Sequence, residues 1–151
     1  MIKIICVGKI KENYLKEAIK EYEKRLSKYT KLKIIEVNDF DNSSKEIILS
    51  KEKDEILKHI EPKDYIITLE IEGNMLSSIE FANKIDNIFI TNSNITFIIG
   101  GSYGLDDEIK RLSNYKLSFS KLTFPHQLFR VNLLEQIYRS FKINNNEAYH
   151  K

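Results

Sequence analysis

Cysteine, proline and glycine are scarce in this chain of 151 residues, which has one Cys, two Pro, five Gly and no Trp. A single cysteine, Cys6, excludes an internal disulfide, and neither it nor any histidine stands at a spacing typical of zinc ligands. With so little proline and glycine and no low-complexity tract, no segment resembles a flexible linker or a disordered tail. We therefore expect one compact domain, residues 1–151, and no metal site.

Long hydrophobic runs are also missing from the sequence. The longest apolar stretches, such as Ile95 to Ile99, are far below the roughly 18 residues that a membrane-spanning helix requires. The amino terminus has no apolar stretch followed by a small-residue cleavage site, so it does not resemble a secretory signal. The sequence therefore predicts a cytoplasmic protein without a membrane partner.

Charge is nearly balanced overall, at +2, but it is unevenly distributed along the chain. Residues 1–33 hold ten Lys or Arg and four acids, residues 34–108 hold six and sixteen, and residues 109–151 hold eight and two. If the two ends meet in the fold, they form a positive rim that suits a polyanion such as RNA. A solvated surface of mixed charge explains the same distribution.

Apolar runs rich in β-branched residues recur along the chain and alternate with segments of helical period. The predicted strands are Ile2 to Val7, Leu32 to Val37, Tyr65 to Glu70, Ile95 to Ile99 and, more weakly, Lys116 to Phe119. The predicted helices are one with an apolar stripe from Leu15 to Leu26, one capped by Ser43 or Ser44 that ends before Pro62, and one capped by Ser77 or Ser78.

Strands that alternate with helices predict parallel pairing, because a parallel pair needs a crossover connection. The predicted fold class is therefore α/β. Open parallel sheets bind ligands at the carboxyl ends of their strands, which directs attention to the loops after Val7, Leu69, Ile99 and Phe119.

The last helical segment, Gln127 to Phe141, differs from the others because its apolar residues cover more than one face. Such a helix is usually buried on two sides. We expect it both to lie deep in the fold and to form a subunit interface.

The loop Gly100-Gly101-Ser102-Tyr103-Gly104 follows a strand and opens a helix whose first turn is expected to carry Asp106, Asp107 and Glu108. Glycines at such a place either let a ligand approach backbone N–H groups or satisfy a tight turn. Their spacing is not G-x-G-x-x-G, and acids at a helix start repel phosphate. A cofactor without phosphate fits this loop better than a dinucleotide does.

The segment from Leu117 to His126 leaves the fifth predicted strand and reaches Pro125, which can sit in the first turn of the final helix. An ordinary loop with a helix cap explains the same pattern. His126 is more often a hydrogen-bonded structural histidine than a base, and Cys6 fits a buried strand thiol.

The carboxyl end of the chain carries Arg130, Arg139, Tyr149, His150 and Lys151. The two arginines lie on an otherwise apolar helix and need partners, because an unpaired buried charge is costly. Internal pairing near Glu135, pairing across a dimer, and contact with substrate phosphate are the alternatives. The terminal Tyr-His-Lys would otherwise be a frayed tail.

Four segments together resemble the RlmH family of the SPOUT superfamily of methyltransferases. They are MIKIICVGKIKENY at the amino terminus, TLEIEGNMLSS, FIIGGSYGL and LSFSKLTFPHQLFRVNLLEQIYRSFKINNNEAYHK at the carboxyl end. The ordered combination of IGGxxG, the TFPH-to-EQIYR run and a terminal NxxYH is highly specific, and the resemblance covers the whole chain.

The resemblance implies an α/β fold whose carboxy-terminal part forms a trefoil knot, an exception to the rule against threaded connections. It also implies a homodimer and a bent S-adenosylmethionine in a pocket formed by the knot loops. The implied cofactor contacts are Leu69, Gly101, Ser120, Lys121, Leu122, Thr123, Phe124 and Pro125. These positions lie in the strand-end loops that the parallel-sheet rule selects.

The family reaction implied is methylation of ring N3 of a pseudouridine in the 23S rRNA stem-loop that touches the decoding region. The implied substrate is the assembled 70S ribosome, with neither DNA nor a membrane as partner. The residues that resemble the substrate-side set are Arg130, Arg139, Tyr149 and His150. Our hypothesis is that His150 or a nearby group accepts the N3 proton, and that the arginines stabilise the developing anion or hold phosphate.

The family commonly ends in Tyr-His-Arg, whereas this chain ends in Lys151. Lysine keeps the charge but loses bidentate phosphate geometry, so a specific role for this position is not implied. We expect the tail to complete the active site of the other subunit. Because the chain has no appended RNA-binding domain, ribosome recognition is expected from the dimer surface, including Lys9, Lys11, Lys24, Arg25 and Lys28.

Two other functions remain compatible with parts of the sequence. A non-enzymatic ribosome-binding or assembly factor would not need the glycine loop or the SFSKLTFP run. A flavodoxin-like nucleotide or flavin binder follows from the parallel-sheet pattern alone, but the loop after Val7, GKIKEN, has one glycine and no phosphate-binding pattern.

Overall fold

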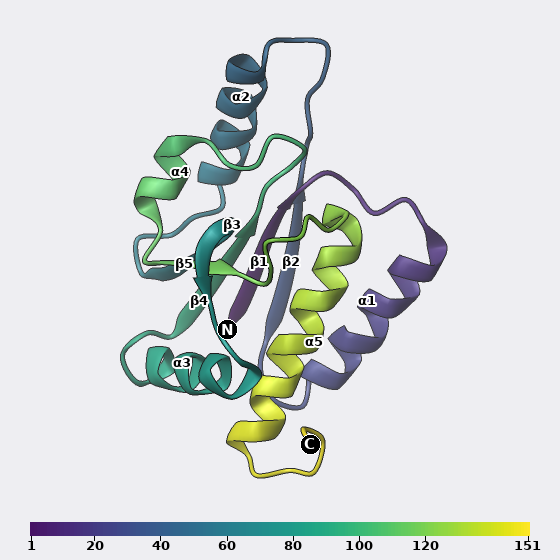
Figure 1. Ribbon diagram of the computed structural model, residues 1–151, viewed down its shortest axis with the longest axis vertical. Helices are drawn as coiled ribbons and strands as arrows, with labels where there is room; N and C mark the ends of the chain where they lie inside the picture. The colour runs from purple at the N-terminus through teal and green to yellow at the C-terminus, as the bar shows by residue number, and fades with distance from the viewer.

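The computed structural model describes residues 1–151 as a five-stranded parallel sheet with helices on both faces (Figure 1). The strand order is β2-β1-β4-β3-β5, which confirms the predicted α/β class. In chain order the elements are β1 (Ile2–Val7), α1 (Asn13–Leu26), β2 (Leu32–Val37), α2 (Lys45–Leu57), β3 (Asp64–Met75), α3 (Ser78–Thr91), β4 (Asn94–Ile99), α4 (Asp107–Leu112), β5 (Tyr115–Ser118) and α5 (His126–Asn144).

Strand β3 is longer than the sequence pattern predicts. The predicted strand is Tyr65 to Glu70, whereas β3 continues to Met75. Its pairing with β5 breaks between Leu69 and Asn74, both of which face Leu117. At Gly73 a side chain would place its Cβ 2.8 Å from the carbonyl oxygen of Lys116, so only glycine permits this close approach. The apolar residues that predict this strand end at Leu69, where the pairing with β5 breaks.

Side-chain caps fix where several helices start. Ser44 accepts a hydrogen bond from the Ile47 N–H, and Ser77 and Glu80 form a reciprocal capping box. Asp106 caps α4 from outside rather than lying in its first turn, because its side chain accepts from the Glu108 N–H. Pro125 likewise precedes α5 instead of occupying its first turn.

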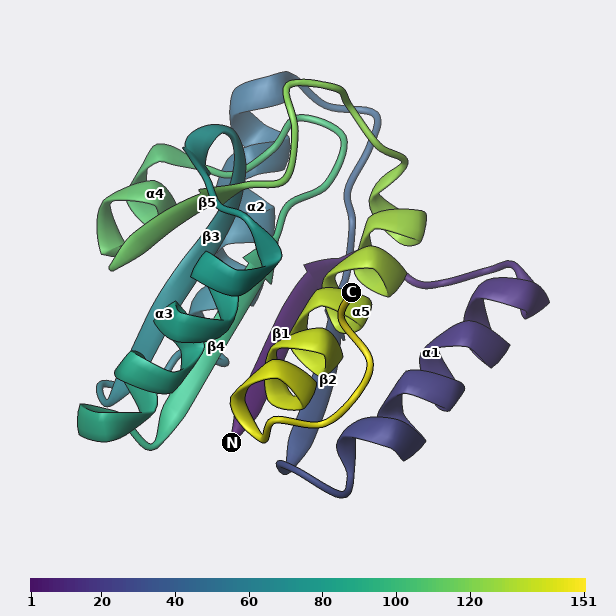
Figure 2. The same ribbon diagram turned by 60° about the horizontal axis from the view of Figure 1, so that its bottom comes forward.

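Two hydrophobic cores lie on the two faces of the sheet. Helices α1, α3 and α5 cover one face, and α2 and α4 cover the other (Figure 2). Helix α5 lies between α1 and α3, and its residues Leu133, Leu134 and Ile137 are fully buried against the sheet. The expectation that α5 lies deep in the fold is therefore confirmed. None of the helices combines the length and the apolar composition that a bilayer-spanning segment needs.

A buried ion pair joins the amino-terminal ends of β1 and β3. The Lys3 Nζ lies 2.7 Å from Asp64 Oδ2, and both side chains are at most 3% exposed. Lys3 also donates to the His59 carbonyl, and Asp64 accepts from the Glu61 N–H and from Asn94 Nδ2. Burial alone would raise the pKa of Asp64, but the Lys3 ammonium and the Glu61 N–H hold it below its ordinary value.

Replacing Lys3 by methionine is expected to lower the free energy of unfolding by about 3–5 kcal/mol, because it leaves the Asp64 carboxylate buried without its cation. Urea denaturation measures this loss. The matched control is Lys58→Met, which removes the exposed pair with Glu55 and should change stability by less than about 1 kcal/mol. Equal effects of the two substitutions would contradict the structural role of the Lys3 pair.

Candidate functional site

A cavity of about 230 Å³ opens at the carboxyl ends of β4 and β5 and at the point in β3 where its pairing with β5 breaks. It is lined by the middle of β3, the glycine loop after β4, the loop after β5 and the first turn of α5. Its lining residues are Leu69, Glu70, Ile71, Ile99, Gly100, Gly101, Ser102, Gly104, Ser118, Phe119, Ser120, Leu122, Thr123, Phe124, His126 and Phe129. This is the edge of a parallel sheet at which ligands bind.

Six of the eight positions implied as cofactor contacts line this cavity: Leu69, Gly101, Ser120, Leu122, Thr123 and Phe124. Lys121 and Pro125 belong to the same loop but do not line it. Phe119 and Phe129 also line the cavity and are not among the positions that the resemblance implies; their rings pack edge to face, with centroids 4.7 Å apart. The sequence did contain a signal for these two residues, because one aromatic residue stands on each side of the TFPH run, residues 123–126.

The shape of the glycine loop depends on one close backbone approach and on one residue with a positive φ. A Cβ on Gly100 would lie 2.3 Å from the Gly104 carbonyl oxygen, and Gly104 itself has a φ of +79°. The Gly104 N–H donates to the Gly101 carbonyl at 3.1 Å and closes the turn. The turn therefore requires these glycines, and the same requirement leaves the backbone beside the cavity uncovered.

Arg130 is a buried structural residue in this chain. Its side chain is 2% exposed, and its Nη1 lies 2.7 Å from Glu36 Oε2. Its Nη2 donates to the carbonyl oxygens of Val7 and Gly8 at 3.1 and 2.7 Å. The predicted contact of Arg130 with substrate is therefore not supported: the guanidinium ties α5 to the ends of β1 and β2 and does not reach the surface.

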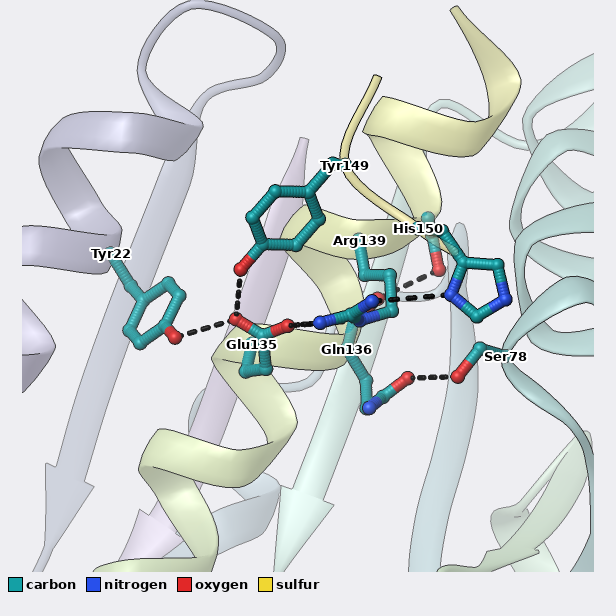
Figure 3. Close-up of polar contacts among 8 residues, drawn as sticks. Tyr22, Ser78, Glu135, Gln136, Arg139, Tyr149 and His150 are labelled. Carbon is teal, nitrogen blue, oxygen red and sulfur yellow. Dashed lines mark hydrogen bonds and ion pairs between the residues drawn. The ribbon is translucent and has the colours of Figure 1, made fainter. Parts of the chain in front are cut away.

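Glu135 on α5 is the centre of a polar cluster that the sequence analysis did not identify as such (Figure 3). Its Oε2 accepts from the hydroxyls of Tyr22 and Tyr149 at 2.5 and 2.9 Å. Its Oε1 accepts from Arg139 Nε and Nη2 at 2.9 and 2.7 Å. Of the alternatives for Arg139, internal pairing with Glu135 is the one that the structure shows.

His150 joins this cluster through Arg139, whose Nη1 lies 3.1 Å from His150 Nδ1 (Figure 3). The Arg139 guanidinium also stacks over the Tyr149 ring at 4.6 Å. Burial first, and then the hydrogen bond to Glu135, raises the pKa of Tyr149, so its hydroxyl stays protonated and donating. The structure therefore brings Arg139, Tyr149 and His150 together and leaves the His150 side chain exposed.

A second carboxylate, Glu147, holds the tail against α1 and α5. It accepts from Lys142 Nζ and the Tyr29 hydroxyl at 2.9 Å, and from Lys28 Nζ at 3.4 Å. The hydrogen bonds from Lys142 and Tyr29 lower the pKa of Glu147 to about 2. The tail is therefore a docked segment, and the two basic ends of the chain do meet in the fold.

The cavity and the tail cluster lie apart on the same helix. The cavity meets α5 at His126 and Phe129, whereas the cluster is built on Glu135 and Arg139. At a rise of about 1.5 Å per residue, Phe129 and Arg139 are roughly 15 Å apart along the axis. One chain alone therefore does not place His150 beside its own cavity.

The chain matches a known protein family over almost its full length. Residues 1–150 match a family model described as "Predicted SPOUT methyltransferase". The chain belongs to the SPOUT methyltransferase family. This membership confirms the resemblance on which the site residues were chosen.

Two relatives of this SPOUT methyltransferase share its whole length. It is 56% identical to ribosomal RNA large subunit methyltransferase H of Clostridium botulinum (strain Alaska E43 / Type E3), with 99% of both chains covered. It is 57% identical, at the same coverage, to the protein of that name in Clostridium tetani. A solved structure of a probable methylase family protein from Haemophilus influenzae Rd KW20 has a TM-score of 0.56 at 14% identity, covering 99% of this chain and 70% of that one, which supports the fold alone.

The docking of the tail is expected to depend on the ionisation of Glu147. Because the pKa of Glu147 is lower in the docked state than in a free chain, docking is fully favoured above about pH 4.5 and weakens as the pH falls toward 2. Glu147→Gln should loosen residues 145–151 at neutral pH, which backbone NMR relaxation at Tyr149 and His150 measures. Glu46→Gln, at an exposed position on α2, is the control, and an equally rigid tail in Glu147→Gln would contradict this anchoring.

Proposed function

We propose that this protein transfers a methyl group from S-adenosylmethionine to ring N3 of a pseudouridine in 23S rRNA, in the stem-loop that touches the decoding region. The observation that carries the proposal is the cavity at the strand ends, which six of the eight implied cofactor residues line. The names of the full-length relatives support large-subunit rRNA as the substrate class. We further propose the assembled 70S ribosome, in the cytoplasm, as the form that is methylated.

The residues at the cavity fit S-adenosylmethionine, which supplies a methyl group on a positively charged sulfonium. Leu69, Leu122 and Phe129 give apolar walls for an adenine ring, and the loop backbone offers N–H and C=O groups to its edge. Glu70 also lines the cavity and brings a negative charge that suits a cation rather than a phosphate. Gly101 leaves room for close approach of a ligand to the backbone.

The tail cluster supplies the substrate side. Arginine can only donate, so the neutral His150 ring accepts at Nδ1 and carries its proton on Nε2, where it faces outward. That N–H and the Arg139 guanidinium can stabilise negative charge on the carbonyl oxygens of the base. His150 or a nearby group accepts the N3 proton, and the N3 nitrogen then takes the methyl group, whose bond to the sulfonium sulfur breaks and leaves a neutral thioether.

A homodimer brings the two halves together. Because the cavity and His150 are far apart in one chain, we propose that the tail of one protomer faces the cavity of its partner. Exposed apolar side chains beside the cavity, Leu122 at 72%, Leu128 at 40% and Phe124 at 37%, support an interface there. We also propose that residues 119–125 and α5 form the trefoil knot with the loop after β4.

Exposed basic residues on and before α1 support RNA as the substrate. Lys9, Lys11, Lys24, Arg25 and Lys28 are exposed on and before α1, which packs beside α5. Their side chains can pair with phosphates of a folded RNA without a separate RNA-binding domain.

Transfer of a labelled methyl group to ribosomes that lack the modification tests the proposal, with free rRNA and separated subunits in parallel. We expect one modified pseudouridine, on assembled ribosomes only. Deletion of residues 149–151 or His150→Ala should lower the rate about 100-fold or more, whereas His59→Ala should not. If both tail variants keep full activity, the tail is not part of the active site. If the protein binds the cofactor but transfers no methyl group, the substrate assignment is overturned.

Complementation between two inactive variants tests the shared active site. Thr123→Trp fills the cavity from an exposed loop position, and deletion of residues 149–151 removes the tail. Co-refolded mixtures should regain about a quarter of the wild-type rate, because random pairing gives half heterodimers with one intact site each. Formation of heterodimers without recovery of activity would show that each site is built from one protomer.

A further inference from the structure

A second cavity, of about 210 Å³, adjoins the cavity at the strand ends. It is formed by the end of β1, the loop from β2 to α2, part of α2 and the glycine loop. Gly101, Ser102 and His126 line both cavities, so the glycine loop lies between them. The second cavity is smaller than the roughly 300 Å³ at which pockets for drug-sized ligands begin, so it suits a small ligand.

Glu52 of α2 lines this second cavity with a carboxylate that is only partly satisfied. The residue is 4% exposed. Its Oε2 accepts from the Phe40 N–H at 3.4 Å, but its Oε1 has no hydrogen-bond partner. An unpartnered buried carboxylate oxygen is costly, and a ligand that donates to the carboxylate would account for it.

The charge of the cavity indicates the sign of such a ligand. Three carboxylates line it, those of Asp39, Asp41 and Glu52, whereas no lysine or arginine does. Burial raises the pKa of Glu52, the Phe40 N–H offsets part of this rise, and the charge of Asp39 adds to it. A cation would therefore be attracted to the cavity, and a ligand with a phosphate or a carboxylate would be repelled.

Apolar and aromatic side chains line the cavity together with these carboxylates. They are those of Val7, Phe40, Ile48 and Tyr103. Methylene groups pack against such side chains, and an ammonium group is attracted to the face of an aromatic ring. No group of three or more His, Cys, Asp or Glu side chains is placed to hold a metal ion. The lining therefore fits an aliphatic chain that carries ammonium groups.

We propose that the second cavity binds an aliphatic diamine or polyamine, with the Glu52 carboxylate accepting hydrogen bonds from one ammonium group while Asp39 and Asp41 attract another. The methylene chain between the ammonium groups lies against Val7 and Ile48. Each end of this ligand meets negative charge, and the ligand brings no anionic group of its own. The inference does not rest on the proposed methyl transfer, because it follows from the charge and the lining of this cavity.

Binding of 1,4-diaminobutane to the full chain tests the site, measured by isothermal titration calorimetry in phosphate buffer at about 150 mM salt, which screens diffuse attraction to the surface. Butylamine has the same carbon chain with a single ammonium group, and we expect it to bind about ten-fold more weakly. The uncharged 1,4-butanediol should not bind. Backbone amide shifts at Phe40 and Gly101, followed by NMR, locate the bound diamine.

Three variants assign the binding to the buried carboxylate. Glu52→Gln should weaken 1,4-diaminobutane about ten-fold or more, and glutamine keeps an oxygen for the Phe40 N–H, so the fold should survive. Asp39→Asn, at an exposed position, should weaken it by a smaller factor and does not alter the buried contact. Asp54→Asn is the matched control, because that carboxylate lies on the same helix with 66% of its side chain exposed.

Each outcome decides for or against the site. Weaker binding in Glu52→Gln and Asp39→Asn but not in Asp54→Asn, with amide shifts at Phe40 and Gly101, supports it. Equal losses in all three variants would show diffuse attraction to surface charge and would overturn it. No binding to the unmodified protein at about 10 mM diamine, or equal affinity for butylamine or butanediol, would overturn it as well.

Discussion

The buried guanidinium of Arg130 constrains the position of α5 against the sheet. It pairs with Glu36 on β2 and donates to the last carbonyl of β1, so that α5 has one position along the strand ends. Glu36 in turn accepts from the Ile10 N–H, which fixes the chain as it leaves β1 toward α1. Because an unpaired charge at this depth would cost several kcal/mol, α5 cannot shift without losing the pair.

The position of α5 determines both functional regions. Its first turn contributes His126 and Phe129 to the cavity, and Phe129 packs against Phe119 of the preceding loop. Its later turns present Glu135 and Arg139, which bind Tyr149 and His150. A rigid helix thus holds one half of a proposed active site at each end. A flexible loop would not keep the distance between the two halves fixed.

The elements and the cavity could be predicted from sequence because they depend on local patterns. Period-two and period-3.6 apolar residues mark the strands and helices, and the strand-end rule selects the loops around Gly101 and Leu122. The long-range pairs could not be read in this way. Arg130 and Glu36 are 94 positions apart, and Glu52 stands among other charged residues in SKEKDE, where nothing local shows that it is buried. Only the packing of α2 against the sheet gives that carboxylate its environment.

The separation of charge along the sequence becomes a separation in space. The acidic middle of the chain supplies Glu70 to the cavity at the strand ends, where the proposed cofactor carries its positive sulfonium charge. The basic ends meet where α1 packs beside α5, around a tail that two carboxylates hold in place. In the proposed function, the cationic cofactor and the RNA are therefore each attracted to a different part of the surface. The net charge of +2 is the sum of two basic ends and an acidic middle that cancel, which explains why composition alone indicates so little about function.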